Sequence, residues 1–150
     1  MKERFEWVQS WCDETLSDDL PRVLLIGDSI TRQYQDRVRE LLRDKCYVDY
    51  FSSSYAADSP LYKTLIKAFI RDSKYSVIPD KAWGKRVSER NAAIDELSEE
   101  FGFSIDDLYS VSRTIDSNGR SNDGTHFKEE GIDILANIVV KSILNVLNNR

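Results

Sequence analysis

Ser29 has the position in this chain that most suggests chemistry. It follows Gly27 and Asp28 at the end of an apolar run, in the stretch VLLIGDSITRQY that covers residues 23–34. A glycine there permits a tight exit from a strand, and a serine that heads the next helix stands where backbone N–H groups face an oxyanion. Aspartate and serine are also preferred helix caps, so a simple cap explains the same residues without any chemistry.

A second candidate segment holds the only histidine of the chain. His126 lies three residues after Asp123 in the stretch NDGTHFKEEG. A serine hydroxyl becomes a good nucleophile when a base takes its proton, and an imidazole is a better base when a carboxylate fixes its tautomer. A surface histidine beside an Asp123-Gly124 turn is the alternative interpretation of this segment alone. Combined with Gly27-Asp28-Ser29, the pattern indicates nucleophilic catalysis more specifically than either segment does.

The rest of the chain predicts alternating strands and helices that would bring these segments together. Short β-rich or apolar runs predict strands, and apolar residues at helical spacing predict helices. The expected strands are 22–27, 46–52, 74–78 and 103–105. The expected helices are 3–16, 31–44, 61–70, 85–101 and a last one from Glu129. Gly102 would end the helix 85–101. This alternation is typical of an α/β layered domain with right-handed crossovers. Ligands of such sheets bind beyond the carboxyl ends of the strands, where Ser29 is expected.

Length and composition exclude several classes of function. The chain has 150 residues and a net charge of −5 without a dense basic run, so we expect one domain over 1–150, with 1–20 as a helical extension, and no nucleic-acid partner. Cys12 and Cys46 lack the spacing of a zinc site or a disulfide framework. No apolar stretch has the length of a membrane span or a secretory signal, which predicts a soluble cytoplasmic protein.

The two segments also carry a family resemblance. PRVLLIGDSITRQY and SNDGTHFKEEGIDILA resemble the first and last motif blocks of the SGNH, or GDSL-type, esterases and acylhydrolases, and VSERNAAIDEL and IDDLY resemble segments of one bacterial branch. The likeness runs in patches from about Glu6 to Leu147. It implies a three-layer α/β/α flavodoxin-like fold, Ser29 as the nucleophile, His126 as the base and Asp123 as the acid that orients it. It also implies a small acyl ester as substrate and no metal or organic cofactor.

The chain departs from this family at the oxyanion hole. The family uses the backbone N–H of the nucleophile, a glycine after the second strand and an asparagine in a Gly-x-Asn block after the third. Ala57 stands at the glycine position, where its N–H would serve if its φ suits a β-carbon. After 74–78 the chain continues as PDKAWGKRVSERN without a Gly-x-Asn block, so we expect a fold reduced by one strand–helix unit. By type alone, the candidate replacements are Trp83, Asn118 and Asn122, whereas Asn91 belongs to the helix 85–101.

Three functions are consistent with these patterns. The leading hypothesis is a serine ester hydrolase that uses Ser29, His126 and Asp123. The second is a catalytically impaired SGNH-like remnant that binds a ligand or a protein, and the third is a doubly wound domain in which Gly27-Asp28-Ser29 merely caps a helix. The motifs determine neither the identity of the ester nor the oligomeric state.

Overall fold

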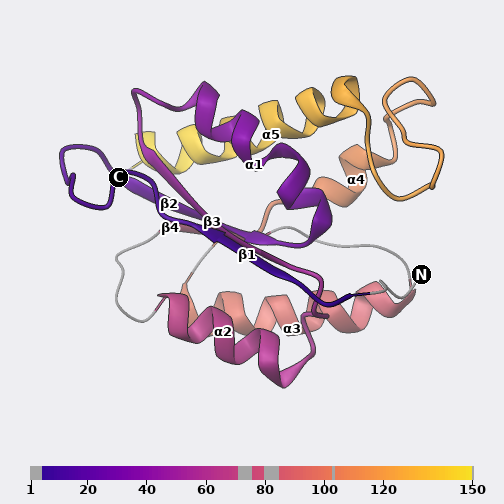
Figure 1. The fold of residues 1–150 in the computed structure, drawn as a ribbon, viewed down its shortest axis with the longest axis horizontal. Coiled ribbons are helices and arrows are strands. Elements are labelled where there is room, and N and C mark those ends of the chain that lie inside the picture. The colour runs from indigo at the N-terminus through magenta and orange to yellow at the C-terminus, as the bar shows by residue number, and fades with distance from the viewer. Residues whose placement is uncertain (1–4, 71–75, 80–84, 103, 150) are drawn as a thin grey trace.

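The protein is a mixed α/β structure with a sheet between two layers of helices. The computed structural model describes residues 5–70, 76–79, 85–102 and 104–149. Figure 1 shows α1, α4 and α5 on one face of the sheet and α2 and α3 on the other. The elements are β1 (Val8–Trp11), β2 (Arg22–Gly27), α1 (Ser29–Leu41), β3 (Tyr47–Ser53), α2 (Pro60–Ile70), β4 (Ser76–Pro79), α3 (Lys85–Phe101), α4 (Leu108–Ser112) and α5 (Glu129–Asn148).

The sheet is mostly parallel, with one antiparallel edge strand. Its order over the described residues is β1-β3-β2-β4, and β2 runs parallel to both β3 and β4. In the register of β2 and β3, Gly27 lies opposite Ser52, so these two strands end at the same edge of the sheet. The loops after them, which lead to Ser29 and to Ala57, therefore leave the sheet side by side.

Strand β2 is buried on both faces, which explains its unbroken apolar sequence. Its residues 23–26 are at most 1% exposed. Val23 and Leu25 pack in the core with α1 and α5, whereas Leu24 and Ile26 pack in a second core with α2 and α3. A strand with helices on both sides needs apolar side chains at every position rather than at alternate ones.

Most of the expected elements are present close to their predicted positions. Strands β2 and β3 match the predictions for 22–27 and 46–52, and β4 covers 76–79, while Lys74 and Tyr75 of the predicted strand lie outside the described residues. Helix α1 begins at Ser29, two residues earlier than the apolar spacing indicated, because the Asp28 side chain caps it. Gly102 ends α3 with a φ of +67°, as predicted. Helix α4, which was not expected, has Asp107 as its N-cap.

The predicted helix over 3–16, and with it the helical extension over 1–20, is wrong. Residues 8–11 form β1, which pairs antiparallel with β3 and places Val8 opposite Ser53. Trp7, just before the strand, donates its N–H to Ser54 Oγ at 2.7 Å and accepts the Ser54 N–H at 3.1 Å. The aromatic and β-branched residues that suggested a helical stripe also have high strand propensity, and pairing with β3 decides between the two structures.

The predicted strand 103–105 is also wrong where it can be judged. Ser104 and Ile105 lie outside any strand, and Phe103 lies outside the described residues. Ile105 instead packs as a partly buried side chain against the core between the sheet and α2 and α3. No helix in the described part of the chain has both the length and the apolar character needed to cross a membrane.

Candidate active site

Ser29 is the first residue of α1 and follows β2 after a single intervening residue. Asp28 caps the helix, and its Oδ1 accepts the Ile30 N–H at 2.8 Å. Backbone N–H groups in the first turn of a helix have no acceptor within it, and the helix dipole adds partial positive charge at this end. The cap and the candidate nucleophile are therefore compatible, because Asp28 does the capping and Ser29 remains beside the positive end of α1.

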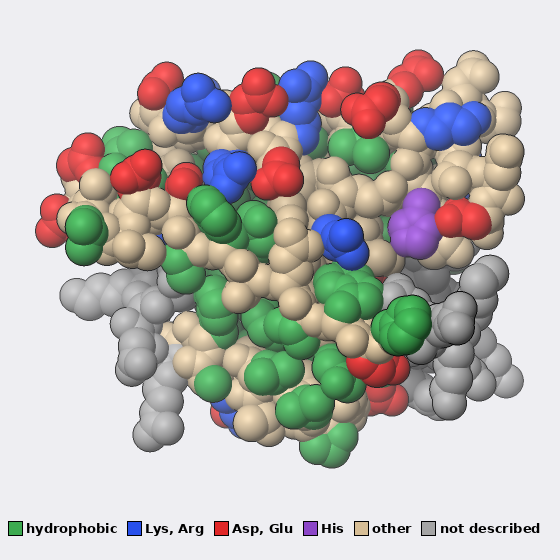
Figure 2. Space-filling model, in the orientation of Figure 1, with side chains coloured by type: hydrophobic (Ala, Val, Ile, Leu, Met, Phe, Trp, Pro, Cys, Tyr) green, Lys and Arg blue, Asp and Glu red, His purple; other side chains and the backbone are tan. Residues whose placement is uncertain are grey.

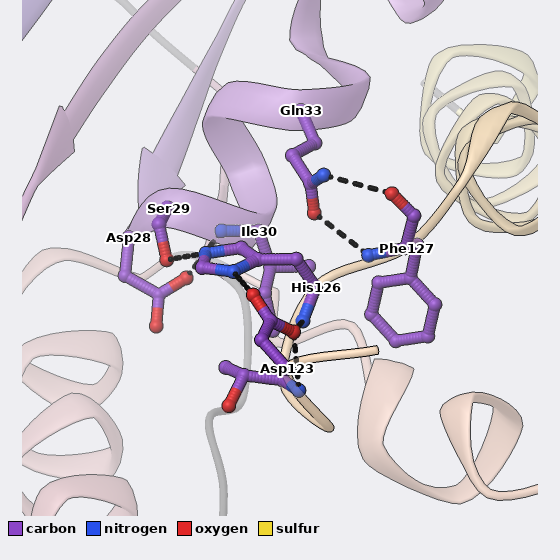
Figure 3. Close-up of polar contacts among 8 residues, drawn as sticks. Asp28, Ser29, Ile30, Gln33, Asp123, His126 and Phe127 are labelled. Atoms are coloured by element: carbon purple, nitrogen blue, oxygen red, sulfur yellow. Dashed lines mark hydrogen bonds and ion pairs between the residues drawn. The ribbon is translucent and has the colours of Figure 1, made fainter. Parts of the chain in front are cut away.

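The structure brings the three sequence-predicted side chains into one hydrogen-bonded chain. His126 Nε2 lies 3.0 Å from Ser29 Oγ, although 97 positions separate the two residues. On the other side of the ring, Nδ1 lies 2.6 Å from Asp123 Oδ2. Figure 3 shows the imidazole between the Ser29 hydroxyl and the Asp123 carboxylate. This is the order nucleophile, base and orienting acid.

The loop before α5 holds the Asp123 carboxylate in a tight turn. Asp123 Oδ1 accepts the backbone N–H groups of Thr125 and His126, each at 2.9 Å, which leaves Oδ2 for the imidazole. Gly124 has a φ of +74°, a left-handed value that strains any residue with a β-carbon. The Asp123-Gly124 turn therefore does not compete with the contact between Asp123 and His126, because the same carboxylate makes both.

These hydrogen bonds keep the Asp123 carboxylate ionised. The His126 side chain and the backbone N–H groups of His126 and Thr125 hold the pKa of Asp123 far below its ordinary value. An ionised Asp123 accepts a hydrogen bond from Nδ1–H, so Nε2 carries the lone pair and accepts the hydrogen bond from the Ser29 hydroxyl. The same negative charge would stabilise an imidazolium ion after proton transfer.

Gln33 is a site residue that the motifs did not identify. Its Nε2 donates to the Phe127 carbonyl at 3.0 Å, and its Oε1 accepts the Phe127 N–H at 3.2 Å (Figure 3). Phe127 is 4% exposed and directly follows His126, so the pair of bonds ties the histidine loop to α1. One signal was present in the sequence, because Gln33 lies four residues after Ser29 and hence on the same side of the helix.

The candidate oxyanion-hole residues make no direct contact with Ser29 that the structure describes. Ala57 lies in the loop between β3 and α2, packs against the core under α2 and α3, and does not have a positive φ. The backbone conformation of Ala57 is therefore compatible with a β-carbon, and its N–H is still a candidate donor. No hydrogen bond joins Ala57, Asn118 or Asn122 to Ser29 in the described residues. Asn91 lies in α3, as expected, and Trp83 lies outside the described residues.

The candidate site is open to a ligand. The side chains of His126 and Asp123 are 35% and 41% exposed. Figure 2 shows the imidazole at the surface, with hydrophobic side chains gathered on the face below it. Over the described residues, no group of three or more His, Cys, Asp or Glu side chains is arranged to hold a metal ion.

Comparison with known proteins places the fold. A solved structure from Slackia heliotrinireducens, described provisionally as an SGNH hydrolase, matches with a TM-score of 0.58 and 14% identity, over 83% of this chain and 100% of that one. This chain has an SGNH-hydrolase-like fold. At this identity the likeness concerns the fold alone. No protein-family model and no curated protein matches the chain in sequence.

Proposed function

We propose that this protein is a serine ester hydrolase of the SGNH type. The observation that carries the proposal is the chain of hydrogen bonds from Ser29 through His126 to Asp123 at the carboxyl edge of the sheet. The order β3-β2-β4 of its parallel strands supports the flavodoxin-like arrangement that the proposal assumes, because a doubly wound sheet of that type begins with strands in the order 2-1-3.

The proposed reaction has two halves. Ser29 Oγ attacks the ester carbonyl carbon while His126 Nε2 takes the hydroxyl proton, and the tetrahedral intermediate collapses as the same nitrogen protonates the leaving alcohol. A water molecule then loses a proton to His126 and attacks the acyl group on Ser29. Collapse of this second intermediate releases the carboxylic acid, and Ser29 regains its proton from His126. Asp123 stays ionised throughout and stabilises each imidazolium state.

The oxyanion of each intermediate would be held by backbone donors. We assign the N–H groups of Ser29 and Ala57 to this role, because the loops that carry them leave β2 and β3 at the same edge of the sheet. The third donor of the family, the asparagine of the Gly-x-Asn block, has no counterpart in the chain. One such donor is worth about 2.7–4 kcal/mol, so we expect turnover roughly a hundred to a thousand times slower than that of an enzyme with all three.

Covalent labelling of Ser29 tests the proposal directly. A fluorophosphonate probe reacts when the serine oxygen attacks phosphorus and fluoride leaves, so we expect label on Ser29, located by peptide mass spectrometry, together with hydrolysis of short p-nitrophenyl esters. Ser29→Ala should lose both signals. Ser117→Ala, at an exposed position in the same loop region as Asp123, is the matched control and should keep both. Intact, folded protein that neither takes the label nor exceeds Ser29→Ala in turnover would overturn the proposal.

The missing asparagine block favours a second candidate, a non-enzymatic module that binds an acyl or carbohydrate ligand or a protein. Such a module would keep the fold and the polar site but would not stabilise an oxyanion. Ligand affinity that is equal in the wild-type protein and in Ser29→Ala, measured by calorimetry and combined with absence of fluorophosphonate labelling, would favour this candidate. Rapid labelling of Ser29 would exclude it.

A further inference from the structure

An arginine with an unusual environment lies next to the candidate nucleophile. Arg32 is exposed and lies three residues after Ser29 on α1, and its guanidinium carbon is 5.1 Å from the centre of the Trp7 ring. Residues three apart on a helix are surface neighbours, with Cβ atoms about 5–6 Å apart. The Arg32 side chain therefore lies beside the Ser29 side chain and rests on an aromatic ring from another element.

Trp7 is held at the same edge of the sheet as Ser29. Its backbone exchanges hydrogen bonds with Ser54, the residue that follows β3, and Ser53 Oγ also donates to its carbonyl at 3.1 Å. Because β3 separates β1 from β2, the Trp7 backbone lies two strand spacings, about 10 Å, from the end of β2. The indole therefore contacts and supports the Arg32 guanidinium at the edge of the sheet where β2 ends.

Arg32 differs in its charge environment from the other two arginines near it on α1. Arg37 pairs with Asp133 at 2.8 Å, and Arg39 pairs with Asp36 at 3.3 Å. Arg32 makes no ion pair with any carboxylate in the described part of the chain. The closest acidic neighbour of Trp7 in sequence, Glu6, accepts a hydrogen bond from Ser54 Oγ at 2.8 Å. The guanidinium edge is therefore open, in a protein whose net charge is −5.

An open guanidinium beside a nucleophile has a specific use. Its planar fork of N–H donors binds carboxylates with two hydrogen bonds, and stacking on an aromatic ring restrains the fork without occupying those donors. An anionic group on the substrate would otherwise be repelled by a protein with excess negative charge. A local cation at the site both offsets this repulsion and fixes the orientation of the ligand.

We infer that Arg32, supported by Trp7, makes this site selective for esters that carry an anionic group, such as a carboxylate, a few bonds from the scissile carbonyl. This inference rests on the proposed hydrolase function and names its substrate class. Arg32 is a specificity-determining residue in this scheme, and it takes no part in the proton transfers of Ser29 and His126.

Matched pairs of esters test the inference. Meta-acetoxybenzoate carries an anionic carboxylate on the alcohol half of the ester, and meta-acetoxybenzamide carries a neutral amide at the same position. The p-nitrophenyl monoesters of adipic acid and of its monoamide place the same difference on the acyl half. For the pair that matches the site, we expect kcat/KM of the wild-type protein to be about 10–100 times higher for the anionic ester, as one charged hydrogen-bonded contact provides.

Variants of α1 and of Trp7 show which residues produce the preference. Arg32→Gln should reduce the ratio of the two kcat/KM values to about one, with the loss on the anionic ester, and Trp7→Leu should reduce it partly because the guanidinium loses its support. Arg37→Gln, on the same helix but paired with Asp133, should leave the ratio at the wild-type value. Added salt should also lower the ratio, since an exposed charge pair is screened.

The outcomes separate this inference from the function on which it rests. Turnover of both members of each pair at equal kcat/KM, or an Arg32→Gln variant that keeps the wild-type ratio, would overturn the inference while leaving the hydrolase intact. Absence of turnover of all four esters together with absence of fluorophosphonate labelling would overturn the hydrolase itself. A ratio that depends on Arg32 for one pair supports the inference and shows which half of the ester bears the charge.

Discussion

The His126 imidazole and the Ser29 hydroxyl meet at 3.0 Å because one helix positions both. Ser29 is the first residue of α1, and Gln33, one turn later, holds the backbone of Phe127 next to the histidine with two hydrogen bonds. The distance between the two candidate reacting groups is therefore set within a small unit, the first turns of α1 and the residues that Gln33 holds.

This arrangement predicts that Gln33 is a positioning residue. Replacement Gln33→Leu removes both bonds to Phe127, so we expect the free energy of unfolding to fall by about 1–3 kcal/mol and kcat to fall by roughly tenfold or more. Urea unfolding and ester kinetics measure the two effects. Gln33→Glu keeps an acceptor for the Phe127 N–H and should recover part of kcat. An unchanged kcat in a destabilised Gln33→Leu protein would show that the contact only supports the fold.

The Asp123 carboxylate is expected to determine the tautomer of the base. Asp123→Asn keeps an oxygen for the turn but presents an amide to the ring, which favours the wrong tautomer, so kcat should fall by about ten-thousandfold. The matched control is Asp116→Asn, because Asp116 Oδ1 accepts the Asn118 and Gly119 N–H groups in another turn of the same loop. This control should keep wild-type kcat. Equal losses in the two variants would mean that turn structure, and not the tautomer, controls the rate.

The low pKa of Asp123 has a consequence for stability. A carboxyl whose pKa is lowered on folding stabilises the folded state above its ordinary pKa, and this contribution disappears as the pH falls toward the folded-state value. The ordinary pKa of Asp is about 3.9. The stability advantage of the wild-type protein over Asp123→Asn should therefore be larger at pH 5 than at pH 3, measured by urea unfolding. An advantage that grows as the pH falls from 5 to 3 would contradict the assignment.

The sequence predicted the convergence of Ser29, Asp123 and His126 better than it predicted the edges of the fold. Gly27-Asp28-Ser29 and Asp123-x-x-His126 are local patterns that can be read from the sequence, and a parallel sheet brings the ends of its strands to one edge. The order of the elements places Ser29 at that edge, whereas the expectation that Asp123 and His126 meet it rested on the combination of residue types and on the family resemblance. Gln33 could not be identified in this way, because an amide on a helix shows its use only when the partner backbone is known.

The N-terminal segment illustrates the opposite case. Its aromatic residues fit a helical stripe as well as a strand, and the choice is made by hydrogen bonds to residues about 45 positions later. Local periodicity carries no information on such pairing. The same long-range pairing brings Trp7 to Arg32. Local sequence patterns therefore could not predict this contact or the substrate preference that it suggests.

The partly buried pair of Arg22 and Asp49 is predicted to anchor the chain between β1 and β2. Asp49 is fully buried on β3, and its Oδ1 accepts from Arg22 Nη1 at 2.9 Å and from the Asp13 N–H at 2.7 Å. Asp49→Ala should lower the free energy of unfolding by about 2–4 kcal/mol, somewhat less than for a fully buried pair because Arg22 retains contact with water. Asp36→Ala, which removes an exposed pair with Arg39, should cost less than about 1 kcal/mol. Chemical denaturation measures both, and similar costs would refute the anchoring role.

The two cysteines should differ strongly in reactivity. Burial raises the pKa of the Cys46 thiol to about 11, and the negative charge of Asp13 adds to this effect, whereas Cys12 is exposed. Because the thiolate is the reactive form, iodoacetamide at pH 8 should modify Cys12 at least about a hundred times faster than Cys46 in the folded protein. Peptide mass spectrometry over a time course distinguishes the two sites, and the same reaction in urea should modify both at similar rates. Fast modification of Cys46 in the folded protein would contradict its place in the core beside α1 and α5.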